Sequence, residues 1–343
     1  MAVTDEQRAR LRQVKLAALA RDRQEHGAVD GVTSDATPLP VGADGAALLR
    51  AGTVEVLTED PGPAALAAAL LVAARSGAAR LVLYVDDLAG DLARWAAPFS
   101  FDVEVREVRG ATSVPAEPTP VPGEPEPADD PDLRRLITGA GADVVVEHGV
   151  VTGEVLGLEV ARLVVWPAEV GGDDAVHLEA GVGRFDRDAA AAMHGEEAPT
   201  EALARAVGVV RAHRYDGAPT HPLSLLARDR WLRSAVLAAP ASVGAAVLEP
   251  VSTTAVRNSV REAAPAAAVG TDAAGNPMLV VCAVGASLSL VPVAADTRAA
   301  RAPHARLVLA VPARDHLPAL DTLAGLLREP AEVLEVPVPW GAT

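Results

Sequence analysis

The chain is poor in lysine, cysteine and aromatic side chains, and each shortage excludes a class of site. Of its 30 lysines and arginines only Lys15 is a lysine, which excludes a Walker A phosphate loop and disfavours a pyridoxal Schiff base. The single cysteine, Cys282, excludes an intramolecular disulfide and any metal site built on several thiolates. Aromatic residues make up 3% of the chain, too few for a surface that stacks nucleic-acid bases.

Long apolar runs and familiar catalytic motifs are also missing. No uncharged apolar run reaches the roughly 18 residues that suggest a membrane span, and the N-terminal residues MAVTDEQRARLRQVK are charged where a secretory signal is apolar. We therefore expect a cytoplasmic protein without a membrane partner. The formal charge of −16 disfavours long, non-specific contact with nucleic-acid phosphates, because such contact depends on Lys and Arg. The GxSxG, HExxH and GxGxxG patterns do not occur.

What is present predicts an α/β protein. Half of the 343 residues are hydrophobic, enough for the cores of two or three domains of roughly 100 to 200 residues each. Apolar strands, among them Arg80–Val85, alternate with helices, which favours two small αβ lobes with mainly parallel or mixed sheets around a central β-hairpin and a helical insert. Seven prolines among acids and small residues favour an extended linker between the lobes. The expected segments are an N-terminal helix and loop (1–45), the first αβ lobe (46–110), the Pro-rich linker (111–131), the central hairpin with Arg-rich helices (132–240) and the second αβ lobe (241–343).

The two lobes show signs of an internal repeat. ARLVLYVDD in the first lobe, followed by an apolar helix and DVEVREV, resembles ARLVLAVPARD in the second, followed by LPALDTLAGLLRE and AEVLEVP. The same number of positions separates Val54 from Leu81 and Val280 from Leu307. We therefore expect one αβ plan to occur twice.

The second lobe also resembles a known family. AVGTDAAGNPMLVVCAVGASLSLVPVAADTRAA, followed by a strand and a last αβ unit, resembles the core of the restriction-endonuclease-like superfamily, in which an acid before a hairpin is followed by Glu-x-Lys on the second strand. Asp272 matches the acid, and Gly275 with Asn276 matches the hairpin turn; where the Glu and the Lys should stand, this chain has Cys282–Val284. The resemblance implies a degenerate nuclease-like fold that lacks a metal ligand and the activating lysine.

Two segments of the central region, Gly153–Val165 and Val176–Arg184, have the alternating pattern of strands and predict one antiparallel hairpin. Their loop is centred near Val170, so we expect Glu159 about opposite Gly181. In this register one face is a core face of Leu, Val and Ala. The other face carries two glutamates and a histidine among small residues.

Those three polar residues, Glu159, His177 and Glu179, permit two interpretations. Carboxylates on diagonal positions of a sheet lie roughly 7 to 8 Å apart at the backbone, within reach of one divalent cation or of a shared proton. The functional interpretation is a Mg²⁺ or Mn²⁺ site, or a general acid–base pair, made by Glu159 and Glu179 with His177. The structural interpretation is a solvent-exposed strand face, or ion pairs to nearby arginines.

Arginines gather on two predicted helices, Thr200–His213 and Pro222–Leu237. Between Leu203 and Arg233 there are six arginines and two acids, a positive region in an acidic chain, which indicates a site for an anion. The alternative is that these arginines neutralise the protein's own acids. The candidate anion-binding residues are Arg184, Arg211, His213, Arg214, His221, Arg228, Arg230 and Arg233.

These patterns predict a non-catalytic binding or interaction protein on a degenerate nuclease-like scaffold, with no cofactor. Its partner is expected to be an anionic small molecule, a nucleic-acid end or a protein, bound through the Arg-rich central region. The alternative is a metal-dependent hydrolase of the phosphodiesterase or nuclease class, in which Glu159 and Glu179 hold Mg²⁺ or Mn²⁺. Nothing in the sequence specifies the oligomeric state.

Overall fold

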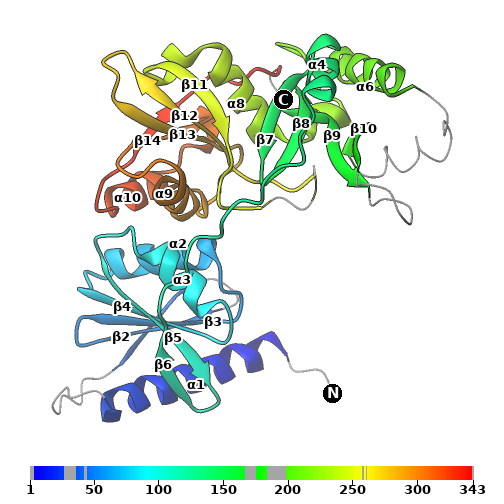
Figure 1. Cartoon of the computed structure of the whole chain (residues 1–343). Helices are drawn as coiled ribbons and strands as arrows, with labels where there is room; N and C mark the ends of the chain where they lie inside the picture. Colours follow the sequence, from blue (N-terminus) through cyan, green and yellow to red (C-terminus); the bar gives the residue numbers. More distant parts are fainter. Residues whose placement is uncertain are drawn as a thin grey trace. The chain divides into compact units, whose positions relative to one another are not determined.

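The computed structural model describes residues 4–26, 36–41, 45–166, 175–183, 198–256, 259 and 261–341. It shows the predicted α/β fold, with three sheets and their covering helices (Figure 1). None of the described helices combines the length and the apolar character that crossing a membrane requires.

The contacts divide the chain into two compact units, and each is assembled from separate stretches. Unit 1 is formed by the chain up to Val121 together with Ala286–Ala300 and Leu317–Val333. Unit 2 is formed by Pro122–Gly285, Arg301–His316 and the residues from Leu334 on. The predicted organisation used continuous segments only, because changes in composition mark linkers but do not show which distant segments pack together.

The sheet of unit 1 is mixed. Its order is β1-β2-β3-β4-β5-β6, with β3, β4 and β5 parallel and the other neighbours antiparallel. The central strand β4 reads RLVLYV and is buried from its second residue on, as expected for a strand covered on both faces. The strands are β1 (Thr37–Leu39), β2 (Gly45–Arg50), β3 (Thr53–Thr58), β4 (Arg80–Val85), β5 (Asp102–Arg109) and β6 (Thr112–Pro115).

Helices cover both faces of this sheet. Helix α1 (Asp5–His26) lies along one face, where Leu16 and Leu19 are buried, while α2 (Pro63–Arg75) and α3 (Ala89–Ala96) lie on the other (Figure 1). The later stretches of unit 1 carry most of α9 (Leu290–Arg301) and α10 (Pro318–Gly325).

The expected linker, residues 111–131, is only partly without regular structure. Its first residues form β6, which pairs with the end of β5. Residues 116–130 contain no helix or strand, and Asp130 caps the next helix, α4 (Pro131–Gly139), by accepting the N–H groups of Asp132 and Leu133. Strand β6 has only four residues and prolines follow it, so little in the sequence indicates a strand here. Pro115 is tolerated in it because it occupies the last position.

In unit 2, the expected hairpin is a four-stranded antiparallel sheet in the order β10-β9-β8-β7. Helices α4 and α6 (Pro199–His213) pack against it, and Ile137, Leu158 and Leu203 are among the buried residues between them. The strands are β7 (Asp143–Glu147), β8 (Val150–Val155), β9 (Leu158–Trp166) and β10 (Ala175–Ala180).

The prediction of one strand over 153–165 was wrong. Leu156 and Gly157 have φ angles of 48° and 75°, so they form a tight turn between β8 and β9 of the kind that needs positive φ at both central residues. The predicted register was also wrong by one residue, because Glu179 lies opposite Arg162 and the Gly181 N–H donates to the Val160 carbonyl.

The second sheet of unit 2 has the order β11-β12-β13-β14-β15. From β11 to β14 its pairings are antiparallel, antiparallel and parallel, the same as from β1 to β4 in unit 1. The registers differ by one residue, because Val54 faces Leu81 whereas Val280 faces Val308; the sequence repeat stays a prediction. The strands are β11 (Ala245–Val251), β12 (Ala266–Asp272), β13 (Pro277–Cys282), β14 (Arg306–Val311) and β15 (Glu332–Glu335).

The expected helix over Pro222–Leu237 is two helices, α7 (Pro222–Leu225) and α8 (Arg228–Ala238). The break lies at Ala227, which has a φ of 42°. Helix α8 then packs against β12 and β13, where Leu232 and Trp231 are buried.

Candidate functional site

Glu159 and Glu179 are brought to the same arginine. Both carboxylate oxygens of Glu159 accept from Arg162, at 2.7 Å from Nε and 3.0 Å from Nη2. These hydrogen bonds raise the pKa of Arg162, and the charge of Glu179 adds to the effect. His177 stacks on Trp166, with ring centroids 4.3 Å apart. Glu159 is also buried, so its contact with Arg162 is an ion pair of the kind that the structural interpretation describes.

The described part of the chain contains no group of three or more His, Cys, Asp and Glu side chains placed to hold a metal ion. The observed pairing puts Arg162 opposite Glu179, one residue away from the predicted register.

Two of the candidate anion-binding arginines are neutralised by buried acids. Arg230 and Arg233 on α8 each contact both Glu147 on β7 and Glu154 on β8; Nη1 of Arg230 and Nη2 of Arg233 lie 3.0 Å from Glu154 oxygens. Burial alone would raise the pKa of Glu147, but the charges of Arg233 and Arg230 hold it below its ordinary value. This buried quartet joins the four-stranded sheet to α8 and has no charge left for a ligand.

A third candidate, Arg214, holds main-chain oxygens. Its guanidinium, 1% exposed, donates to the carbonyls of Leu156, Leu223, Leu226 and Ala227. Three of these carbonyls lie at the break between α7 and α8, and the Ala227 carbonyl also accepts the Trp231 N–H. Arg214 therefore stabilises the break.

The remaining candidates differ in their surroundings. His213 and His221 stack face to face with ring centroids 3.6 Å apart, and Nδ1 of His221 accepts the Leu223 N–H at the start of α7. Arg211 is exposed and donates to the Gly141 carbonyl. Arg184 lies outside the described residues. Arg228 lies over Trp340, which lines a cleft.

That cleft, of about 250 Å³, lies in unit 2 where β14 and β15 end. Pro312 interrupts the ladder directly after β14, and Ala313–Asp315 turn as a short 3₁₀ helix. After β15, the Val336 N–H still donates to the Val311 carbonyl, and the chain continues to Trp340, which forms a parallel bridge with Ala218. The lining residues are Pro312, Ala313, Arg314, Val336, Pro337, Val338, Trp340 and Gly341. Open α/β sheets commonly bind ligands at the carboxyl ends of their strands.

A stack of two indole rings, tilted by 55° to each other and flanked by a guanidinium on each side, supports one wall of the cleft. The Arg214 guanidinium lies 4.4 Å from the centre of the Trp231 ring, Trp231 lies 5.3 Å from Trp340, and the Arg228 guanidinium lies 4.9 Å from Trp340. Each cation–π contact is worth about 0.5 to 2 kcal/mol, more when desolvated. The stack therefore holds Arg228 over an indole that lines the cleft.

Two like charges meet at this edge. Burial first, and then the charge of Arg314, lower the pKa of Arg228, although an arginine remains charged at neutral pH. Two acids of this edge, Asp229 and Asp315, are buried and accept main-chain N–H groups: Asp229 from Val284 at 2.9 Å and Asp315 from Gly285 at 2.8 Å. These hydrogen bonds stabilise the loop after β13. Asp315 also lies 3.9 Å from Nε of Arg314, and Arg314 lines an apolar cleft next to Arg228.

Arg314 and Trp340 were not among the residues predicted from the sequence. The signal that could have found Arg314 is its place directly after the apolar run ARLVLAV, at the carboxyl end of a predicted strand. Trp340 follows a proline-rich segment without periodicity, so its contact with Arg228 depends on tertiary packing. Comparison of the chain with protein-family models, with curated proteins and with solved structures finds no match.

Proposed function

We propose that the protein is a non-catalytic binding protein whose ligand carries a carboxylate or phosphate next to a small apolar group. The observation that carries the proposal is the pair Arg228 and Arg314 beside an apolar cleft floored by Trp340. A bound anion would relieve the repulsion between the two guanidinium groups, and arginine is suited to bidentate contact with both kinds of anion.

The size of the cleft limits the ligand. About 250 Å³ is slightly below the roughly 300 to 1,000 Å³ typical of drug-sized ligand pockets. A single ring or a branched aliphatic group fits this space with its anionic group at the arginines. The ligand is therefore a small molecule, or the end of a larger one.

The nuclease-like scaffold remains part of the proposal. The β12–β13 hairpin followed by α9 and β14 supports it, since the family resemblance implies this order. Asp272, the residue matched to the family's acid, accepts from Ala274 and Asn276 in the hairpin turn, and these hydrogen bonds, first that of the Asn276 side chain, lower its pKa. The turn lies at the opposite end of β13 from Cys282. This geometry favours a binding role, as does the Arg162 contact that occupies Glu159.

Isothermal titration of phenyl phosphate and benzoate into the full chain tests the proposal, with benzyl alcohol as the uncharged probe. We expect one site for the anions, no binding of the alcohol, and quenching of tryptophan fluorescence. Because a hydrogen bond to a charged group is worth about 1.5 to 3 kcal/mol, Arg228→Gln and Arg314→Gln should each weaken anion binding by roughly 10- to 100-fold.

The matched control is Arg211→Gln, which removes an exposed arginine of the same unit outside the cleft. It should leave the affinity unchanged. Equal loss in all three variants would assign binding to general positive charge, and no anion binding by the wild-type chain would refute the proposed function.

A further inference from the structure

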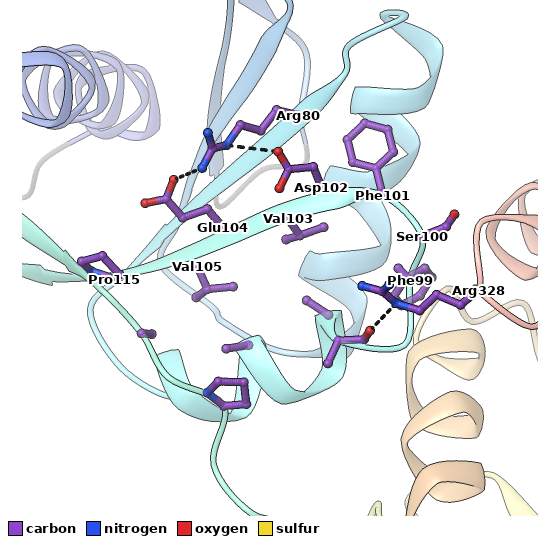
Figure 2. A pocket seen from close by; sticks show the side chains of 15 residues that line it. Arg80, Phe99, Ser100, Phe101, Asp102, Val103, Glu104, Val105, Pro115 and Arg328 are labelled. Carbon is purple, nitrogen blue, oxygen red and sulfur yellow. Dashed lines mark hydrogen bonds and ion pairs between the residues drawn. The ribbon is translucent and has the colours of Figure 1, made fainter. Parts of the chain in front are cut away.

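A second cleft, independent of the first, opens in unit 1 beside the edge of β5 (Figure 2). Its volume is about 610 Å³, within the roughly 300 to 1,000 Å³ usual for binding pockets. Helix α3 and the segment that follows β6 line it, and Phe99 and Phe101 lie at the end away from Pro115 (Figure 2). Fifteen residues of β5, α3 and the neighbouring segments line it.

The edge of β5 is open along this cleft because β6 is short. Strand β6 covers only Arg106–Arg109, and beyond it the Ala116 N–H donates to the Val105 carbonyl at 2.9 Å. The chain then turns away, and the Thr119 N–H donates to the Gly90 carbonyl at the start of α3. Pro115 and Pro118 have no N–H to continue the ladder.

Val103 is the residue that this departure leaves at the edge. Successive residues of a strand point their main-chain N–H and C=O groups to alternate sides. The main-chain groups of Val105 point to the side on which β6 lies. Those of Val103 therefore point to the same side, at a position past the end of β6. No described residue is hydrogen-bonded to Val103 on that side.

The charges of the cleft are unevenly compensated. Arg80 is balanced by acids of β5, with its Nη2 2.7 Å from Glu104 and its Nε 3.5 Å from Asp102 (Figure 2). Arg328 is exposed and lies beside Phe99 (Figure 2). Its Nε donates to the Ala97 carbonyl, which is neutral, and its main-chain N–H donates to the Pro98 carbonyl. A ligand of this cleft is therefore complementary if it carries a carboxylate at the Arg328 end and an apolar group along α3 and Phe101.

We propose that an extended peptide of a partner protein binds here by adding a strand to β5. Its main chain bonds the N–H and C=O of Val103 and continues the line of pairing that β6 begins. An apolar side chain lies against α3, and a carboxylate of the peptide pairs with Arg328. Strand addition of this kind takes its affinity from main-chain hydrogen bonds and its specificity from pockets for alternate side chains.

Selection of a phage-displayed random hexapeptide library on the immobilised full chain supplies the probe. Enriched peptides are expected to contain an acidic residue beside an apolar one. A synthetic copy should slow hydrogen exchange of the Val103 amide to the rate of Glu107, which pairs with Val114 in β6. A copy with N-methylated main-chain amides should bind at least tenfold more weakly. Failure to enrich any peptide, or full affinity of the methylated copy, overturns the proposal.

Two variants locate the site. Val103→Pro removes the edge N–H without touching the side that pairs with β4, whereas the control Val103→Thr keeps it; we expect a tenfold loss of affinity only for proline. Arg328→Gln should remove the preference for the acidic peptide over its amide analogue. If Val103→Pro fails to fold, hydrogen exchange of the Val103 amide in the wild-type chain and the affinity of the N-methylated peptide still test the proposal. Protection elsewhere, with Val103 unaffected, refutes this site.

Discussion

Replacing Arg233 by methionine tests how far the buried quartet stabilises unit 2. The guanidinium is 1% exposed and contacts Glu147 and Glu154, both buried. Methionine keeps the apolar length of the side chain and removes only the charge. The two carboxylates are then left with Arg230, which already contacts both.

Removing one partner of a buried ion pair costs about 3 to 5 kcal/mol, because a buried charge loses its compensation. Arg230 remains, so we expect the lower end, a loss of about 3 kcal/mol in the free energy of unfolding. Adding Glu154→Gln removes one negative charge as well and restores a balanced pair of Glu147 and Arg230. The double variant should therefore be more stable than Arg233→Met alone by at least about 1 kcal/mol.

Urea unfolding at pH 7, followed by tryptophan fluorescence in a Trp95→Phe background, measures these changes. The three other tryptophans, at 166, 231 and 340, lie in unit 2. Arg135→Met is the control, since Arg135 is 77% exposed and forms an ion pair with the exposed Asp132; a surface pair of this kind is worth at most about 1 kcal/mol. The reasoning would be refuted if Arg233→Met lowered the free energy of unfolding by less than about 1 kcal/mol, or if the double variant were less stable than the single one.

Two further changes follow from the same unit. Gly157→Ala should destabilise the protein by about 2 to 4 kcal/mol, since an added Cβ would lie 2.3 Å from the Arg230 carbonyl carbon at a φ of 75°; Gly217→Ala, also at positive φ but with open space, separates backbone strain from the clash in a thermal melt. The difference in stability between wild type and Glu147→Gln should be full at neutral pH and shrink as pH falls below about 4.5, because a lowered pKa contributes stability that is lost on protonation. Urea midpoints from pH 7 to pH 3 measure it, and a difference that grows on acidification would contradict the assignment.

Local patterns predicted much of the fold and little of the site. The strand over residues 80–85 was confirmed at both ends because its apolar run is bounded by turn residues. The turn at Leu156 was missed because leucine rarely adopts positive φ. The next residue of the turn, Gly157, packs on the backbone of α8, a contact that the local sequence does not indicate. The partners of Arg230 and Arg233 come from strands far away in the sequence, which no spacing on the helix reveals. The charges of Arg230 and Arg233, which are part of the positive count of the helices, are therefore neutralised inside the protein.

The discontinuous units have a consequence for synthesis on the ribosome. Unit 1 begins at the N-terminus but includes Leu317–Val333, and at about 5 to 20 residues per second roughly 10 to 40 s pass between the emergence of Val121 and that of its last stretch. During this interval, the surface of α2 that α10 later covers is accessible to chaperones. No fragment that ends before residue 317 contains either unit whole, so attempts to express one unit alone by truncation will yield an incomplete core.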